Sequence, residues 1–263
     1  VGPEHLPVRL VERTKNYKWG AAIFMTYVGV KTDMAAKGLG NHNVWQFDGY
    51  DFEEYYAYAQ DQTAPDTRGC YITSATFKDP HTHDHAPPGV TSVEIMSLVP
   101  GEPTAWGVAP EDAFSWGYKR DERYRALKDR LESQMVDRLE ALYPGTREHI
   151  VFQESATPVS HMRYTRATRG TGYGIACSPD QWMQNRPGYR TPVEGLYVCG
   201  ASTRSGHGVV GAMLGGHHVA YVLGRLKELM EDWIGGVELD DHGVIYGIRR
   251  YTRGTRLLTH TDH

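Results

Sequence analysis

Cysteine is scarce in this sequence of 263 residues, and none of it is paired in a redox or metal-binding motif. The three cysteines, Cys70, Cys177 and Cys199, are scattered and odd in number, and no C-x-x-C motif occurs. This pattern argues against a disulfide framework and against a cysteine zinc site. It fits a reducing compartment, so we expect a cytoplasmic protein.

Long apolar runs and an excess of basic residues are also missing. No stretch approaches the roughly 20 apolar residues that span a bilayer, and the N-terminus lacks the basic-then-apolar pattern of a signal peptide. The formal net charge of −4 leaves no basic footprint for nucleic acid or an anionic membrane surface. Peripheral contact with a membrane stays open.

The first two hundred residues contain no glycine-rich fingerprint for a dinucleotide. The matching string, GHGVVG, spans residues 206–211. In a dinucleotide site the strand ends at the first glycine, and an acid about 20 residues later binds the ribose. Here the predicted strand ends earlier, at Cys199 and Gly200, and the acids that far on, Glu228 and Glu231, fall inside a predicted helix. The string therefore does not predict an ordinary first-strand Rossmann site.

Hydrophobic periodicity predicts a mainly sheet-forming first hundred residues, followed by a long helix. Within the first predicted strand, Trp19, Ile23, Met25 and Tyr27 share one face. In residues 121–143 the apolar residues are spaced by three and four, which is typical of an amphipathic helix. The full prediction is strands at 18–30, 43–49, 69–77, 91–99, 149–155 and 194–200, helices at 51–60, 121–143 and 212–233, loops at 163–174 and 201–211, and a hairpin or edge strand at 244–252.

The late glycines admit two interpretations. A loop with so many glycines lets backbone N–H groups and a helix N-terminus approach an anionic or electron-rich ligand. Alternatively, a face of small residues lets the helix pack closely against a sheet. The spacing alone favours neither, and the residues concerned are Gly206, Gly208, Gly211, Gly215 and Gly216.

Two segments carry a resemblance to a known family. TPVEGLYVCGASTRSGHGVVGAMLGGHHVAYVL, residues 191–223, resembles the C-terminal flavin motif of the phytoene desaturase and retinol saturase group, within the flavin amine oxidase-like superfamily. TPVSHMRYTRATRGTGYGIACSPDQWMQNRP, residues 157–187, resembles the same group through its R-Y-T, Y-G and Q-x-x-x-x-R-P elements. GPEHLP and DPHTHDHAPPG are weaker matches at comparable places.

The resemblance implies a fold, a cofactor and a partner. It describes the chain as the C-terminal half of an FAD-dependent oxidoreductase. The expected class is α+β or α/β: a mixed-sheet substrate domain at 1–155, the closing strand and helix of a Rossmann-like FAD-binding domain at 156–234, and a tail at 235–263. A second chain or cleaved segment, carrying the N-terminal G-x-G-x-x-G half, is expected to complete the FAD site in a hetero-oligomer.

The resemblance also implies the residues that meet FAD. They are Gly200 and Ala201 after the strand, and the Gly208-Val209-Val210-Gly211 segment at the start of the helix. A helix dipole aimed at the flavin ring would stabilise negative charge on the reduced cofactor. Many family members carry an acid just after the strand glycine, whereas this chain has Ala201 and Ser202. Whether the side chain at this position contacts FAD, as the acid does in those members, is therefore left open.

Flavin chemistry leaves the protein to position the substrate, exclude water and move a proton. For substrate contacts we select Tyr27 and Trp45, although aromatic residues in strands usually pack in a core. The catalytic candidates are His207, whose imidazole can transfer a proton near neutral pH, and Tyr173. The expected reaction is dehydrogenation or saturation of an apolar, isoprenoid-like substrate. A flavin amine or alcohol oxidase subunit and a non-catalytic scaffold subunit are the alternatives.

Histidine and arginine clusters do not predict further sites. His81, His83 and His85 alternate as metal ligands can, but their proline-rich loop favours solvation, and no metal is expected. His217 and His218 project about 100° apart on a helix, which is poor geometry for one ion. A loop arginine could steady a phosphate or carboxylate, although exposure is commoner; the arginines concerned are Arg163, Arg166 and Arg169.

Overall fold

The structure, a computed structural model, divides the chain into two compact units. Tyr17–Ala176 form the first, here named the sheet unit. The second, the loop unit, combines Val1–Asn16 with Cys177–His263. The functional division predicted at residues 155–156 stays a prediction. The residues that the structure describes are 2–60, 64–82 and 84–222.

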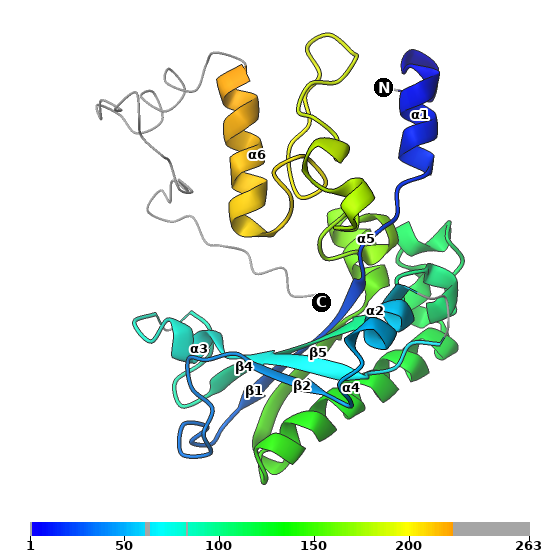
Figure 1. The fold of residues 1–263 in the computed structure, drawn as a ribbon. Helices are drawn as coiled ribbons and strands as arrows, with labels where there is room; N and C mark the ends of the chain where they lie inside the picture. The colour runs from blue at the N-terminus through cyan, green and yellow to red at the C-terminus, as the bar shows by residue number, and fades with distance from the viewer. Residues whose placement is uncertain (1, 61–63, 83, 223–263) are drawn as a thin grey trace, which may run out of the picture. The chain divides into compact units, whose positions relative to one another are not determined.

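A five-stranded sheet forms the centre of the sheet unit (Figure 1). Its strands follow the order β2-β3-β4-β1-β5, and neighbouring strands are antiparallel. Strands β1 and β4 are the longest and pair along their whole lengths. The combination of helices and sheet confirms the predicted class, but the predicted mixed sheet was wrong, because each of these strands pairs with its neighbours in the antiparallel direction. The Rossmann-like part of the fold stays a prediction. The strands are β1 (Ala22–Val30), β2 (Val44–Phe47), β3 (Gly69–Thr73), β4 (Thr91–Val99) and β5 (Ile150–Ala156).

One predicted strand ends early and becomes a helix. The run 69–77 was predicted as a single strand, but β3 stops at Thr73 and helix α3 occupies Ala75–Lys78. The backbone N–H of Ala75 leaves the sheet ladder and donates to the carboxylate of Glu94 at 3.3 Å. The prediction was wrong beyond Thr73 because a side-chain acceptor replaces the strand partner at this point. The helix predicted at 51–60 is confirmed as α2, Phe52–Gln60.

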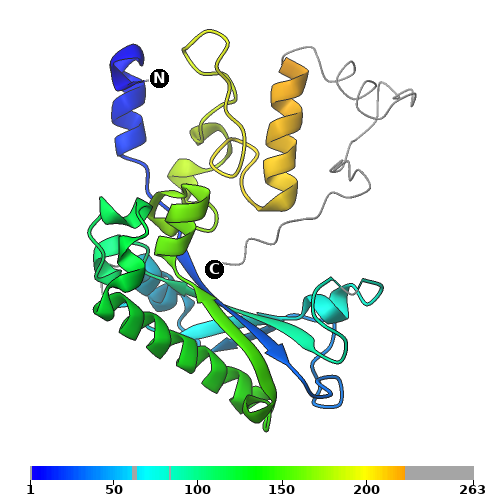
Figure 2. The same ribbon diagram turned by 180° about the vertical axis from the view of Figure 1, so that it is seen from behind.

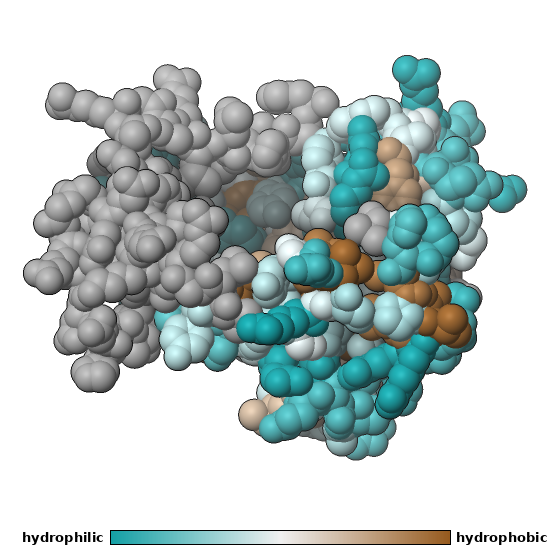
Figure 3. Space-filling model, turned by 90° about the horizontal axis from the view of Figure 1, so that it is seen from above, coloured by the Kyte–Doolittle hydropathy of each residue, from teal (hydrophilic) through white to brown (hydrophobic). Residues whose placement is uncertain are grey.

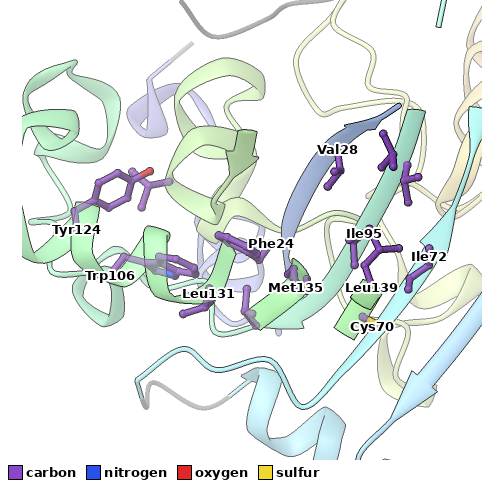
Figure 4. Close-up of a cluster of buried hydrophobic side chains, with 14 of the residues drawn as sticks. Phe24, Val28, Cys70, Ile72, Ile95, Trp106, Tyr124, Leu131, Met135 and Leu139 are labelled. Atoms are coloured by element: carbon purple, nitrogen blue, oxygen red, sulfur yellow. The ribbon is translucent and has the colours of Figure 1, made fainter. Parts of the chain in front are cut away.

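Helix α4, Glu122–Leu142, packs against β3 and β5 and confirms the predicted amphipathic helix (Figure 2). Asp121 caps its N-terminus by accepting hydrogen bonds from the N–H groups of Arg123 and Tyr124. Figure 4 shows side chains from α4 meeting side chains from β1, β3 and β4. Trp106 joins this core, stacks on Phe24 with centroids 5.9 Å apart, and donates its indole N–H to a backbone carbonyl.

Helix α5, Pro158–Thr165, was not predicted, and its last three residues were assigned to the loop at 163–174. That part of the prediction was wrong. Thr157 and Ser160 form a capping box, and Pro158 occupies the first helical turn. Both are recognised start signals of a helix, so the T-P-V-S string could have revealed it.

The loop unit has little regular structure among its described residues. Helix α1 spans Val8–Lys15 and was not predicted. Helix α6, Gly208–Val222, begins four residues before the predicted start at 212, and the remainder of that prediction lies outside the described residues. The predicted hairpin at 244–252 lies outside them as well. No helix among the described residues is long and apolar enough to cross a membrane.

The strand predicted at 194–200 is not formed. The structure has an isolated bridge between Arg190 and Tyr197 in this segment. A strand needs a paired neighbour to satisfy its backbone groups, and no described strand of the loop unit lies beside this one. Short 3-10 helices complete both units, at Pro3–His5, Pro103–Trp106, Asp112–Phe114, Gly117–Arg120, Arg147–His149, Thr168–Gly170, Pro179–Gln181 and Met183–Asn185.

Candidate functional site

The two faces of the sheet differ in what covers them. Successive residues of a strand point to opposite faces, and residues paired across antiparallel strands point to the same face. One row of paired residues lies on the core side, and each of its members is at most 1% exposed. Within it, the hydroxyls of Thr26 and Ser155 form a hydrogen bond of 2.8 Å. This core row is Ile72, Ile95, Thr26 and Ser155.

The next row of pairs therefore lies on the opposite side, which we call the open face. It crosses all five strands and consists of aromatic, methionine and alanine side chains. Trp45 is 59% exposed, and its ring meets the Tyr71 ring edge-on with centroids 4.8 Å apart. The row is Trp45, Tyr71, Met96, Met25 and Ala156. Because its members are apolar and solvent-accessible, the row can take up an apolar ligand.

Tyr27 also points to the open face, two residues along β1 from Met25, and therefore belongs to the next row of pairs on that same face. It is 42% exposed and pairs with Glu94 on one side and Glu154 on the other. The structure thus brings the two predicted substrate contacts, Tyr27 and Trp45, to the same face from strands that are not neighbours. The contacts themselves stay a prediction.

Glu94 is the carboxyl of the open face with a perturbed protonation equilibrium. Burial raises the pKa of its carboxyl, and hydrogen bonds from the Ala75 N–H and the Ser92 side chain, together with the nearby charge of His85, offset part of that rise. Desolvation penalises the ionised form. Glu94 consequently holds its proton to higher pH than an ordinary glutamate.

A cavity of about 380 Å³ lies beside the β2 edge of the sheet. Its aromatic wall contains Phe47, Phe52 and Tyr55, and the Phe47 ring contacts the other two. The carboxylates around it already have partners: Arg68 binds Glu54 at 3.2 Å, and Arg138 binds Asp48 through two hydrogen bonds of 2.7 Å. The first pair joins α2 to the residue before β3, and the second joins α4 to the residue after β2.

The glycine loop, residues 200–208, is the second candidate feature and lies in the loop unit. Gly200 and Gly208 have φ values of +103° and +79°, a backbone conformation that L side chains rarely adopt. A Cβ at either position would meet no atom within 4 Å. The loop therefore has glycine where its backbone faces open space.

Other glycines of this segment serve packing. A Cβ on Gly211 would lie 2.8 Å from the carbonyl oxygen of Gly206, and one on Gly215 would lie 3.2 Å from the backbone N of Gly200. Both positions bring α6 against the loop. Close packing is thus found at Gly211 and Gly215, where it is against the loop. The approach of a ligand to the loop backbone stays a prediction.

The predicted cofactor contacts differ in accessibility. Val209 and Val210 are exposed, at 78% and 56%, at the first turn of α6, and Ala201 is half-buried. Gly211 is buried against the loop. Contact of these residues, and of Gly200 and Gly208, with FAD stays a prediction.

The catalytic candidates lie in different units. His207 is exposed in the loop unit, immediately before α6. Tyr173 is 43% exposed in the sheet unit, and the neighbouring Gly174 carbonyl accepts a hydrogen bond from the Gly20 N–H at 2.8 Å. Their catalytic roles stay a prediction.

The histidine and arginine clusters are engaged in local contacts. His85 lies 3.8 Å from Asp79, and His83 falls outside the described residues. Within residues 2–60, 64–82 and 84–222, no group of three potential ligands could hold a metal ion. Each of the three arginines contacts another side chain: Arg163, which lies in α5, is over Trp116, Arg166 is over Phe114, and Arg169 pairs with Glu102.

Several site residues were missed or left without a role by the sequence. Alternation alone could place Tyr71 and Met96 on one face of their strands, but not opposite Trp45 and Met25. Arg186 belongs to the quoted Q-x-x-x-x-R-P element, yet no role was assigned to it. Arg186 is 1% exposed, and its guanidinium donates to backbone carbonyls of the glycine loop.

The chain is similar to several known proteins. It is 30% identical over 118 residues to the prolycopene isomerase of Arabidopsis thaliana, covering 43% of this chain and 20% of that protein. It is 34% identical over 103 residues to mouse pyridine nucleotide-disulfide oxidoreductase domain-containing protein 2, covering 37% and 17%. With the 4,4'-diaponeurosporene oxygenase of Staphylococcus aureus it shares 22% identity over 218 residues, covering 81% and 39%.

No protein-family model matches the chain. Among solved structures, an oxidoreductase from Methanosarcina mazei has a TM-score of 0.45 and 17% identity, covering 83% of this chain and 39% of that one. This chain spans less than half the length of each of the three curated relatives named above. The relatives confirm the predicted resemblance: over the matched parts, this chain is similar to a prolycopene isomerase, a pyridine nucleotide-disulfide oxidoreductase domain-containing protein and a diaponeurosporene oxygenase.

Proposed function

We propose that this chain supplies the flavin-facing loop and the substrate-facing sheet of an FAD-dependent oxidoreductase that dehydrogenates or saturates an apolar substrate. One observation carries the proposal. In a chain that is similar over part of its length to a prolycopene isomerase, the glycine loop has its backbone facing open space at Gly200 and Gly208.

The loop residues fit the requirements of a flavin. The ring edge of reduced flavin is electron-rich, and backbone N–H groups at the start of a helix stabilise such a group. Gly200, Ala201 and the Gly208–Gly211 segment would hold that edge. FAD, when bound, supplies hydride acceptance or donation. His207, exposed beside this segment, would move the accompanying proton, and Tyr173 would assist on the substrate side.

The open face supports an apolar substrate. Its row of aromatic and methionine side chains offers a polarisable surface, and methionine adapts its shape to irregular apolar ligands. Trp45 and Tyr27 would line the substrate and exclude water from it. The names of two relatives, prolycopene isomerase and diaponeurosporene oxygenase, support a carotenoid-like compound as the substrate.

Exposed apolar side chains in the loop unit support a partner. Hydrophobic residues reach the surface among hydrophilic ones in Figure 3. In the loop unit the exposed ones include residues of the predicted strand and of α6: Leu196, Val198, Val209, Val210, Leu214 and Tyr221. Clusters of exposed apolar residues commonly mark interfaces. A second chain or segment carrying the N-terminal FAD-binding half would cover them.

Spectroscopy of the natively purified assembly tests the cofactor. We expect the visible absorption band of oxidised flavin, bleached by dithionite. Native mass spectrometry of the same assembly should detect the mass of bound FAD and the mass of a companion polypeptide. A colourless assembly without FAD would refute the enzyme proposal and favour a non-catalytic scaffold.

The substrate surface is tested by a matched pair of variants. Trp45→Ala removes an aromatic ring from the open face, whereas Tyr50→Ala removes one that is 97% exposed and lies outside the strands. We expect the KM for a carotenoid substrate to rise in the first variant and to stay unchanged in the second. Equal effects would contradict the assignment of the open face.

A further inference from the structure

Arg186 is an almost completely buried cation in the loop unit. Its side chain donates three hydrogen bonds to backbone carbonyls: Nε to Thr203 at 3.1 Å, Nη2 to Ala201 at 2.8 Å and Nη1 to Gln181 at 3.3 Å. Two of these acceptors belong to the glycine loop. The planar fork of the guanidinium thus joins that loop to the segment around Gln181 at fixed angles.

The chain that follows Arg186 contacts the same loop. The Arg204 N–H donates to the Pro187 carbonyl at 3.0 Å, and the hydroxyls of Tyr189 and Ser205 form a hydrogen bond. Residues 186–189 therefore run beside the glycine loop and are bonded to it; we name this segment the brace. Arg186 is the member of this brace that is buried and makes several bonds at once.

Holding carbonyls in place also orients N–H groups. In a trans peptide the C=O and the following N–H point in opposite directions. The bond from Arg186 to the Ala201 carbonyl thereby directs the N–H of Ser202 to the opposite side of the loop. A guanidinium at this position sets the orientation of the loop peptides before any ligand arrives, and preorganisation of this kind favours binding.

We propose that Arg186 is the positioning residue of the glycine loop and holds its peptides in the orientation that binds the flavin ring edge. The identity of the ligand rests on the proposed function above. The ordering of the loop by Arg186 does not.

Two variants and one control test the proposal in the full chain, isolated with whatever partner it retains. Arg186→Lys keeps the charge without the fork, and Arg186→Met keeps a similar stem without donors. Arg204→Met removes an exposed arginine from the same loop. We expect amide hydrogen exchange at residues 200–206 to accelerate about tenfold to hundredfold in both Arg186 variants, because charge-assisted hydrogen bonds are lost. The control should exchange like the wild type.

Flavin binding supplies a readout that a general loss of stability would not reproduce. In folded Arg186→Lys, with the far-UV circular dichroism of the wild type, we expect the FAD dissociation constant to rise about tenfold and the visible flavin spectrum to shift. The KM for the substrate should stay unchanged.

The outcomes separate the two proposals. Wild-type exchange rates and FAD affinity in Arg186→Lys would overturn the role of Arg186, and this variant decides the matter where Arg186→Met does not fold. If the wild type binds no FAD, the proposed function fails, and the exchange rates alone support or overturn the positioning role.

Discussion

Gly211 and Gly216 lie in the same helix, yet their replacement by alanine should change stability in opposite directions. At Gly216 a Cβ would meet nothing within 4 Å, so Gly216→Ala should raise the free energy of unfolding by about 0.5–1 kcal/mol through its helix preference. At Gly211 the Cβ would lie 2.8 Å and 2.9 Å from the carbonyl oxygens of Gly206 and Ser205. Overpacking of this kind costs about 1–3 kcal/mol.

The net expectation for Gly211→Ala is therefore a loss of up to about 2 kcal/mol after the helix preference is subtracted. Urea unfolding of the full chain, followed by circular dichroism, measures both variants, and hydrogen exchange in α6 attributes the change to the loop unit. The matched pair cancels the chemical effect of adding a methyl group. Gly211→Ala at least as stable as Gly216→Ala would refute the close contact between helix and loop.

Three further perturbations probe the sheet unit and the thiols. Asp121→Ala removes the cap of α4 and should lower the free energy of unfolding by about 1 kcal/mol; urea denaturation that detects no loss would contradict the cap. A thiol reagent at neutral pH should modify the exposed Cys177 and Cys199 but spare Cys70, which is 2% exposed and whose pKa burial raises to about 11; three rapidly reacting thiols would contradict this burial. Burial raises the pKa of the Glu94 carboxyl. The contribution of this carboxyl to the free energy of unfolding is therefore complete below the unfolded-state pKa and is lost as pH rises through the folded-state pKa. Glu94→Gln stays neutral, so unfolding measured from acid to neutral pH should show the variant gaining stability relative to the wild type; a constant difference would count against a raised pKa.

Local patterns in the sequence were sufficient for most regular elements of the sheet unit. Alternating and apolar runs predicted β1, β2, β4 and β5, and the spacing by three and four predicted α4. They succeeded because burial against a core imposes its period on the chain. The prediction failed at residues 74–77 and 194–200, where the outcome depends on a distant partner. Glu94 is the acceptor in the first case, and the second segment pairs with no strand that the structure describes.

Composition and motifs by themselves determined the family resemblance, the lack of a disulfide or membrane-spanning pattern, and the choice of Tyr27, Trp45 and the glycine loop. Tertiary structure alone decided which glycines face open space and which pack against backbone, because identical residues differ there only in φ and neighbours. It also supplied the contacts from which we propose a role for Arg186. The partners of that side chain are backbone carbonyls, which every residue possesses, so no sequence pattern could predict them.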